Sequence, residues 1–140
     1  MDANLLEIKS KISEIFNVDD DEIIDIFEKS SKINVLKDFV LFSEGKHSDN
    51  LYIIGSGLAD IFKSGEHINS VGKGDLLGEM SLVGVDKSTA TVVAKTDMVL
   101  FKFKKHRFEL LLNKYPKMNQ SIVLMTISRK IQQQDITAEM

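Results

Sequence analysis

The residues best suited to chemistry in this chain form one glycine-led segment, Gly78-Glu79-Met80-Ser81-Leu82. Glycine permits a tight turn, and where such a turn leads into a short helix the first backbone N–H groups lack partners within that helix. Donors of this kind suit a small anion such as a phosphate group. We therefore expect Gly78 to allow the turn and Met80 and Ser81 to direct their amides at an anion.

The other polar residues show no pattern typical of catalysis or of metal binding. His47, His67 and His106 are scattered singly, without the clustered histidine and carboxylate spacing of a metal-binding barrel, and we expect all three on the surface. The chain has no cysteine, which excludes thiolate ligands, cysteine nucleophiles and disulfides. No Ser-His-Asp order, paired carboxylates or Walker-type loop is recognisable. We predict a protein that is not an enzyme and holds no metal or cofactor.

Length and charge narrow the function classes further. The chain has 140 residues, 43% of them hydrophobic and 28% charged, which predicts one globular domain. Its net charge of -3 gives no electrostatic footprint for DNA or for an anionic membrane. The N-terminus lacks the features of a secretory signal, and no apolar run approaches the roughly 20 residues of a bilayer span. We expect a cytoplasmic protein without direct DNA binding.

Three stretches with different residue patterns must position the glycine-led segment. Residues 1–30 have helical periodicity, and Asp19 with Glu22 resembles a capping box at the start of a second helix. From Ile33 to Lys104 the chain changes to short runs of β-branched and aromatic residues separated by glycines. We predict strands near 33–36, 39–43, 50–55, 58–63, 67–71, 88–95 and 97–104. Many short strands at this spacing indicate a sandwich or barrel.

Residues 105–140 return to helical periodicity. The periodicity breaks at Tyr115 and Pro116 and then continues from Lys117 to about Thr137. Because proline is tolerated in a first helical turn, we expect Pro116 to start a second helix. This last helix would have about 20 residues and be about 30 Å long. It has apolar residues on more than one face: Leu124, Ile127 and Ile131 on one stripe, with Ile122, Met125 and Ile136 on the next. We expect it to pack on the barrel and on a second copy or a partner protein.

A wider pattern accompanies the glycine-led segment, which is followed after six residues by Thr89-Ala90-Thr91-Val92. Here the sequence resembles the cyclic-nucleotide-binding domain family, whose phosphate-binding cassette reads Gly-Glu-(Leu/Met)-(Ala/Ser)-Leu, a spacer, then Arg-(Ala/Ser/Thr)-Ala-(Thr/Ser). Further landmarks follow in the family's order, those near the end matching its bacterial catabolite-activator branch: Ser43-Glu44-Gly45, Asn50-Leu51-Tyr52-Ile53, Ser56-Gly57, Gly74-Asp75, Tyr115-Pro116 and Arg129-Lys130-Ile131.

The resemblance implies a mainly β fold with flanking α-helices: a double-stranded β-helix (jelly-roll) barrel with N-terminal helices and two C-terminal helices. A single domain, 1–140, would comprise N-terminal helices at 1–30, a barrel at 33–104 with the cassette at 78–91, and C-terminal helices at 105–140. The implied ligand is cyclic AMP or cyclic GMP. Glu79 would accept a hydrogen bond from the ribose 2′-hydroxyl, Thr89 could contact guanine, and Gln134 would lie where the family's long helix covers the purine.

One departure affects the phosphate side of the predicted site. The family's arginine, which grips the exocyclic phosphate oxygens, falls on Ser88, with Lys87 one residue earlier. Lysine can replace the charge of arginine but not its planar fork. The predicted ligand-binding residues are therefore Gly78, Glu79, Met80, Ser81, Lys87, Ser88, Thr89 and Gln134.

Two functional hypotheses follow. In the first, the domain is a regulatory module that binds a cyclic mononucleotide and relays binding through its C-terminal helix to a second copy or a partner protein, because no helix-turn-helix follows Met140. In the second, the fold has lost its ligand together with the arginine and persists as a dimerisation or protein-interaction module. A metal-dependent barrel enzyme is disfavoured by the isolated histidines, and a chain cut from a larger regulator is a further alternative.

Overall fold

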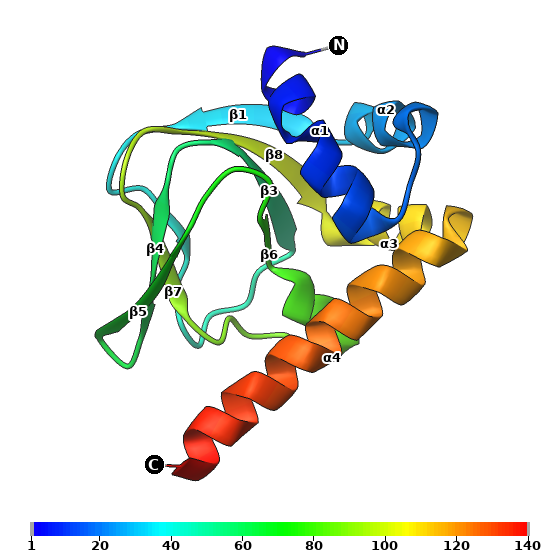
Figure 1. Cartoon of the computed structure of the whole chain (residues 1–140). Coiled ribbons are helices and arrows are strands. Elements are labelled where there is room, and N and C mark those ends of the chain that lie inside the picture. Colours follow the sequence, from blue (N-terminus) through cyan, green and yellow to red (C-terminus); the bar gives the residue numbers. More distant parts are fainter. Residues whose placement is uncertain (1, 140) are drawn as a thin grey trace.

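A computed structural model describes residues 2–139, with side chains described as far as Arg129. Helices precede and follow the strands in the chain and lie together on one side of them (Figure 1): α1 (Ala3–Phe16), α2 (Asp20–Glu28), α3 (Lys105–Lys114) and α4 (Pro116–Glu139). The strands between them are β1 (Ser31–Val35), β2 (Val40–Phe42), β3 (Asn50–Ser56), β4 (Ala59–Lys63), β5 (Glu66–Val71), β6 (Leu76–Leu77), β7 (Thr91–Ala94) and β8 (Met98–Lys104). A 3-10 turn, η1 (Glu79–Val83), follows β6.

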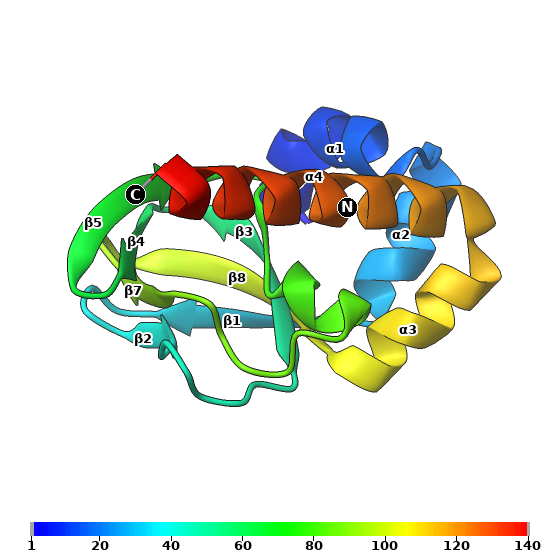
Figure 2. The same cartoon turned by 90° about the horizontal axis from the view of Figure 1, so that it is seen from below.

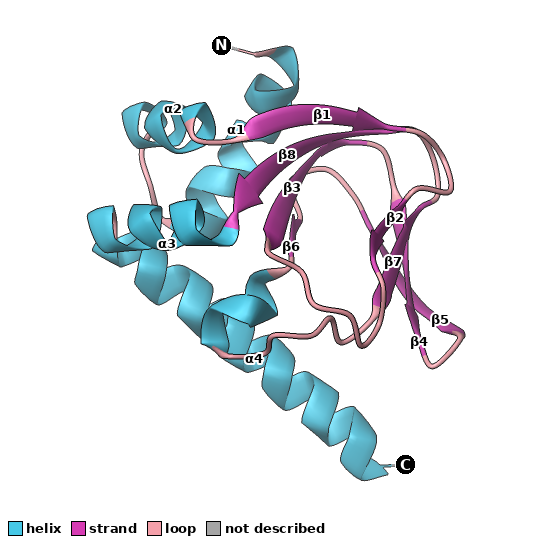
Figure 3. Ribbon diagram, turned by 180° about the vertical axis from the view of Figure 1, so that it is seen from behind, coloured by secondary structure: helices cyan, strands magenta, loops and turns pink. Residues whose placement is uncertain are grey.

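The strands form two antiparallel sheets that curve toward each other (Figure 3), with the orders β1-β8-β3-β6 and β2-β7-β4-β5. Consecutive strands thus alternate between the sheets, except for the hairpin of β4 and β5, as in a jelly roll. One apolar cluster includes residues of both sheets: Val35, Leu41, Phe42, Tyr52, Ile54, Ala59, Leu77, Val92, Ala94, Met98 and Leu100. The predicted jelly-roll barrel with flanking helices is confirmed.

A second apolar cluster joins the first sheet to the helices. Strand alternation explains the division, because Leu100 belongs to the cluster between the sheets while Phe101 and Phe103 belong to the helical one. Phe27 of α2 meets Phe101 and Phe103 edge to face, with ring centroids 5.0 Å and 5.8 Å away. Met118 and Ile122 of α4 are buried in the same cluster, and Leu82 of η1 packs against it. The cluster therefore holds both η1 and α4 against the first sheet.

Local signals predicted the helix ends well. The capping box is present: the Glu22 amide donates to the Asp19 carboxylate at 2.9 Å, and the Asp19 amide donates to the Glu22 carboxylate at 3.2 Å. Pro116 is the first residue of α4, as predicted. The strand predicted at 88–95 begins too early, because β7 starts at Thr91. The sequence also missed β6, whose two residues are too few to show strand alternation.

The last helix runs along the molecule from α3 toward β5 (Figure 2). Met118, Ile122 and Thr126 face the protein and are fully buried, whereas Leu124 is 69% exposed and Ile127 45% exposed. The predicted apolar stripe is thus uncovered at these two positions, while the side chain of Ile131 lies outside the described residues. In the part of the chain that the structure describes, no helix is both long and apolar enough to cross a membrane.

Candidate functional site

Gly78 begins the candidate site, and its position requires glycine for two reasons. Its φ of +92° lies in the left-handed region, which side chains other than glycine adopt at a cost. A Cβ atom there would also come within 2.8 Å of the Asn50 backbone oxygen and 3.0 Å of the Phe42 ring. The backbone can therefore turn sharply out of β6 and into η1 only with glycine.

Within η1 the predicted binding residues Glu79, Met80 and Ser81 lie together, immediately after Gly78. The Ser81 amide donates to the Gly78 carbonyl at 3.3 Å, and the Ser81 hydroxyl donates to the same carbonyl at 2.9 Å. Met80 is half-buried, and Leu82 packs against the helical apolar cluster. The turn is therefore anchored by Leu82. The expectation that the Ser81 amide points at an anion is wrong in this structure, because that amide donates within the turn.

Glu79 is buried, with only 5% of its surface exposed. Its carboxylate forms an ion pair with the guanidinium of Arg129 from α4. The same Nη1 atom of Arg129 donates to the Leu76 carbonyl at 3.3 Å. Because a buried carboxylate needs donors to offset its lost hydration, this pair ties the glycine-led turn to the last helix.

Sequence reasoning did not assign Arg129 to the site, although a signal for it was present. Buried positions of α4 recur every four residues at Met118, Ile122 and Thr126, and a further step of three reaches Arg129. The Thr126 hydroxyl is satisfied within the helix, donating to the Ile122 carbonyl at 2.7 Å. Arg129 is thus the charged residue that continues the buried stripe of α4.

The second part of the cassette, residues 84–90, is a loop and not a strand. Its backbone pairs with the segment after β2: the Ser88 amide donates to the Lys46 carbonyl, and the Gly45 amide donates to the Ser88 carbonyl, both at 2.8 Å. The prediction that Ser88 lies on a strand is therefore wrong, because its hydrogen-bond partners belong to the loop after β2. Ser88 and Thr89 are half-buried and Lys87 is exposed. Gln134 belongs to α4, but its side chain lies outside the described residues.

The predicted surface location of the three histidines is confirmed, since all are exposed. His47 bonds to the Asp49 carboxylate at 2.8 Å and His67 to that of Asp60 at 3.0 Å. The Asp60 carboxylate also accepts from Ser70, at 2.7 Å, and these contacts hold its pKa below the usual value. The Ser70 hydroxyl also lies 3.4 Å from the His67 Nε2 atom that contacts Asp60. Serine and aspartate thus meet the same ring nitrogen, whereas in a hydrolytic triad the histidine contacts them through its two different nitrogens.

A second polar cluster lies where α3 meets α4. Asp25 of α2 accepts hydrogen bonds from the Tyr115 hydroxyl and, at 2.7 Å, from the Lys114 ammonium group. The Lys114 contact, followed by that of Tyr115, lowers the pKa of Asp25, and Asp25 raises the pKa of Tyr115. These bonds fix the start of α4 to the N-terminal helices.

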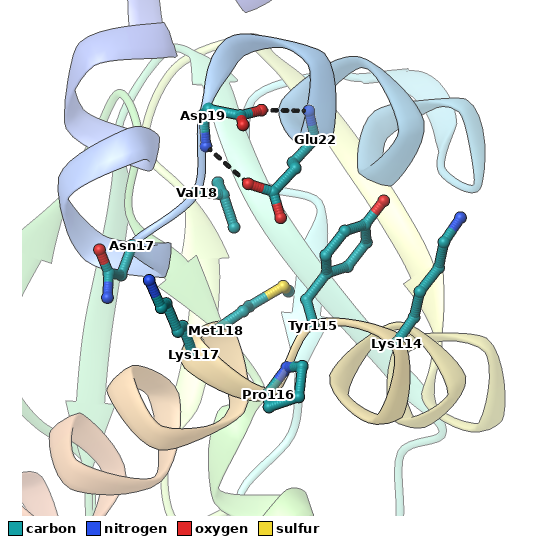
Figure 4. Close-up of a pocket in the computed structure, with 9 residues that line it drawn as sticks. All are labelled: Asn17, Val18, Asp19, Glu22, Lys114, Tyr115, Pro116, Lys117 and Met118. Carbon is teal, nitrogen blue, oxygen red and sulfur yellow. Dashed lines mark hydrogen bonds between the residues drawn. The ribbon is translucent and has the colours of Figure 1, made fainter.

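Beside this junction is an open depression of about 670 Å³ (Figure 4), lined by Asn17, Val18, Asp19, Glu22, Lys114, Tyr115, Pro116, Lys117 and Met118. Its polar groups carry both signs of charge. The Asp19 and Glu22 side chains are already engaged in the capping box, which Figure 4 shows on the α2 side. The lining therefore does not define a ligand class.

Comparison with known proteins agrees with this architecture. A family model described as "Cyclic nucleotide-binding domain" matches residues 32–115, more than half of the chain and all of the cassette. Among solved structures, the catabolite activator protein of Thermus thermophilus aligns with a TM-score of 0.79 and 21% identity over 89% of this chain. The aligned part is 61% of that protein, so this chain spans about three fifths of its length.

Two further structures align over most of their own length. A cyclic nucleotide-binding domain from Methylobacillus flagellatus has a TM-score of 0.74 and 22% identity, covering 94% of this chain and 83% of that one. A structure described as Sp-2Cl-cAMPS bound to PKAR CBD2 has a TM-score of 0.76 and 20% identity, covering 89% and 83%. At these identities the structural likeness shows a shared fold.

Proposed function

Because this chain belongs to the cyclic nucleotide-binding domain family, we propose that it is a regulatory module that binds cyclic AMP or cyclic GMP and relays binding through α4. The observation that carries the proposal is Glu79, a buried carboxylate at the first position of a glycine-led turn, joined to the last helix by Arg129. A solvated turn would not need to bury a carboxylate. A site that recognises a sugar hydroxyl does need a buried acceptor.

The ribose and phosphate of the ligand would meet different parts of the cassette. Glu79 would accept from the ribose 2′-hydroxyl, and the Met80 amide near the start of η1 would face the phosphate. Ser88 offers a hydroxyl where the family has its arginine, and Lys87 offers an exposed point charge beside it. Contacts of Thr89 with guanine and of Gln134 with the purine stay predictions.

The missing arginine sets the expected strength of binding. Loss of one charge-assisted hydrogen bond costs roughly 1.5–3 kcal/mol, or about 10- to 150-fold in affinity. A loss of this size weakens a micromolar site without abolishing it. We therefore propose a cyclic mononucleotide site of reduced affinity, in a protein that acts in binding and not in catalysis.

The output would pass through α4, which contacts η1 on one face and leaves Leu124 and Ile127 exposed on the other. A second copy of the chain or a partner protein would cover these two residues. Direct contact with DNA or a membrane is not part of the proposal, and a cytoplasmic location stays a prediction.

Isothermal titration of the whole chain tests the proposal, with cyclic AMP and cyclic GMP each taken to millimolar concentration. Linear 5′-AMP serves as the matched control, since it carries the same base and sugar without the cyclic phosphate. We expect saturable binding of at least one cyclic nucleotide and weaker binding of 5′-AMP. No heat with either cyclic nucleotide would overturn the proposal. Ser88 would then favour the second hypothesis, a fold retained for dimerisation or protein interaction.

A further inference from the structure

A basic segment lies where β8 passes into α3 (Figure 3), outside the cassette. Five of the six residues 102–107 are lysine, arginine or histidine, and the sixth, Phe103, is buried in the helical apolar cluster. Of the five, Lys102 and Lys105 are half-buried and the others are exposed. Phe103 therefore fixes the segment to the core while the positive side chains gather at the surface.

Few carboxylates of this chain offset that charge. Among the residues whose side chains are described, 2–129, the basic segment has one ion pair, in which the Lys105 ammonium group lies 4.0 Å from the Glu109 carboxylate. Asp49 lies beside the segment, but its carboxylate bonds to His47 at 2.8 Å. An open depression of about 410 Å³ is lined by these two carboxylates and residues 104–106. The segment thus presents net positive charge around two fixed carboxylates.

This positive charge stands at the end of α3 where it stabilises the helix least. A helix N-terminus carries partial positive charge, so acidic side chains stabilise the first turn and basic ones destabilise it. The first turn of α3 has no acidic residue, and Lys104 at its N-cap makes no capping hydrogen bond through its side chain. By contrast, α2 begins with three acidic residues and a capping box. The stability of the fold therefore does not account for the basic segment.

We propose that residues 102–107 and Leu110 form a docking surface for an acidic segment of a partner protein. Leu110 is 64% exposed and follows Arg107 by three residues, so both lie on the same side of α3. The surface therefore offers several positive charges and one large apolar side chain. Its complement is a short run of aspartate and glutamate residues that includes an apolar residue. The nucleotide site proposed above is not needed for this docking.

Two features favour a protein segment over a nucleic acid or a membrane. The whole chain has a net charge of -3, so the rest of its surface repels an extended polyanion. Asp49 and Glu109 stand within the positive surface and would repel an evenly charged phosphate backbone. A protein segment can place a basic or neutral residue opposite each of them, so the mixed charges select a partner whose charge varies along its length.

Fluorescence anisotropy of the whole chain with synthetic peptides tests the proposal. The probes are fluorescein-labelled peptides of about twelve residues, each with one leucine and several glutamates at different spacings, and versions in which glutamine replaces glutamate. We expect saturable binding of at least one acidic peptide, about 10-fold tighter than its glutamine version. Added salt should weaken this binding, because the contacts are between exposed charges.

Two charge-reversed variants locate the binding. Lys104→Glu with Arg107→Glu alters the docking surface, and Lys37→Glu with Lys95→Glu is the matched control, because it changes the net charge equally at exposed lysines elsewhere. We expect the first variant to lose about 10-fold in affinity for the peptide and the control to lose less than about 3-fold. Leu110→Ala should lose about 3-fold, since it removes only the apolar contact.

Urea denaturation separates docking from a structural role. Because glutamate suits a first helical turn, Lys104→Glu with Arg107→Glu should unfold at the same urea concentration as the parent or at a higher one. Unfolding at a markedly lower concentration would overturn the proposal, since the basic residues would then serve the fold.

The binding series has two further outcomes that would overturn the proposal. One is the absence of saturable binding by every acidic peptide, or equal losses in the two double variants. The other is tighter binding of a single-stranded oligonucleotide, or of vesicles containing phosphatidylserine, than of any peptide. If that binding is lost in Lys104→Glu with Arg107→Glu, the surface belongs to a nucleic acid or a membrane instead.

Discussion

The two halves of the cassette differ in how they are held. Residues 78–83 form a turn in which neighbouring atoms leave no room for a side chain at Gly78. The glutamate of this turn is buried and paired with α4. Residues 84–90 form a loop held by two hydrogen bonds between Ser88 and the segment after β2. Gly84 also has a positive φ, of +88°, but a Cβ there would meet nothing within 4 Å.

This difference separates two properties of the site. The first half is tied to the helix that would relay binding, so it should govern sugar selectivity and coupling. The second half is where the family's arginine is missing, so it should limit affinity.

Alanine at the two glycines should affect stability unequally. Gly78→Ala adds a Cβ 2.8 Å from a backbone oxygen at a left-handed φ, and we expect a loss of about 3 kcal/mol in the free energy of unfolding. Gly84→Ala carries only the backbone strain, about 1 kcal/mol. Urea denaturation of both variants measures the difference. Equal losses would show that the first half is no more tightly packed than the second.

Glu79→Ala should remove selectivity for the ribose hydroxyl. The parent should prefer a cyclic ribonucleotide over its 2′-deoxy analogue by about 1–3 kcal/mol, and the variant should show little preference. Loss of the ion pair with Arg129 cancels in this ratio because it affects both ligands alike. Titration with both ligands gives the ratio, and an unchanged preference would mean that Glu79 does not bind the sugar.

Ser88→Arg should tighten binding of cyclic AMP or cyclic GMP by roughly 10- to 100-fold, corresponding to about 1.4–2.8 kcal/mol, by restoring a planar fork to the phosphate side. Added salt should reduce the gain. Lys87→Ala in the parent is the companion variant: if Lys87 already supplies charge, it should lose affinity and the gain from Ser88→Arg should be small. If both variants fold and bind nucleotide with the affinity of the parent, the result would contradict a cyclic phosphate at this loop.

Ile127→Asp should weaken self-association through the outer face of α4. Ile127 is 45% exposed, and losing its burial in a dimer should cost about 1.5 kcal/mol. Sedimentation velocity should show a dimer for the parent and more monomer for the variant. Leu110→Asp is the control, because Leu110 is 64% exposed on α3. A parent and variant that sediment as the same dimer would place the interface elsewhere.

Asp25→Asn should have the smallest effect, and one that depends on pH. Hydrogen bonds from Lys114 and then Tyr115 depress the folded-state pKa of Asp25, so its contribution to stability is present above the unfolded pKa of about 4 and is lost as pH falls through the folded pKa. The variant should therefore be less stable than the parent at pH 7 and approach it near pH 3. Urea denaturation at both values measures this, with exposed Glu14→Gln as control. A constant difference would contradict the assigned contacts.

The sequence was informative wherever the signal was local. The Asp19 and Glu22 capping box, the helix start at Pro116 and the glycine requirement at residue 78 each depend on a few neighbouring residues. The barrel followed from several short strands read together. Fold class was therefore predictable, while β6, with two residues, was not.

The parts of the site that escaped prediction depend on distant contacts. Ser88 pairs with residues 45 and 46, so its loop conformation is set by a segment more than forty positions earlier. Arg129 meets Glu79 across 50 positions, and only the docking of α4 brings them together. Periodicity places Arg129 on the inner face of α4, but it does not say which element that face covers.

Amide chemical shifts of the ¹⁵N-labelled chain during titration with cyclic AMP or cyclic GMP test the central claim most directly, because they report the binding site residue by residue. We predict saturable shifts at residues 78–81 and at Arg129, with smaller ones at residues 87–89. Absence of shifts at residues 78–81, or saturable shifts confined to the depression formed by residues 17–19 and 114–118, would contradict nucleotide binding at the cassette.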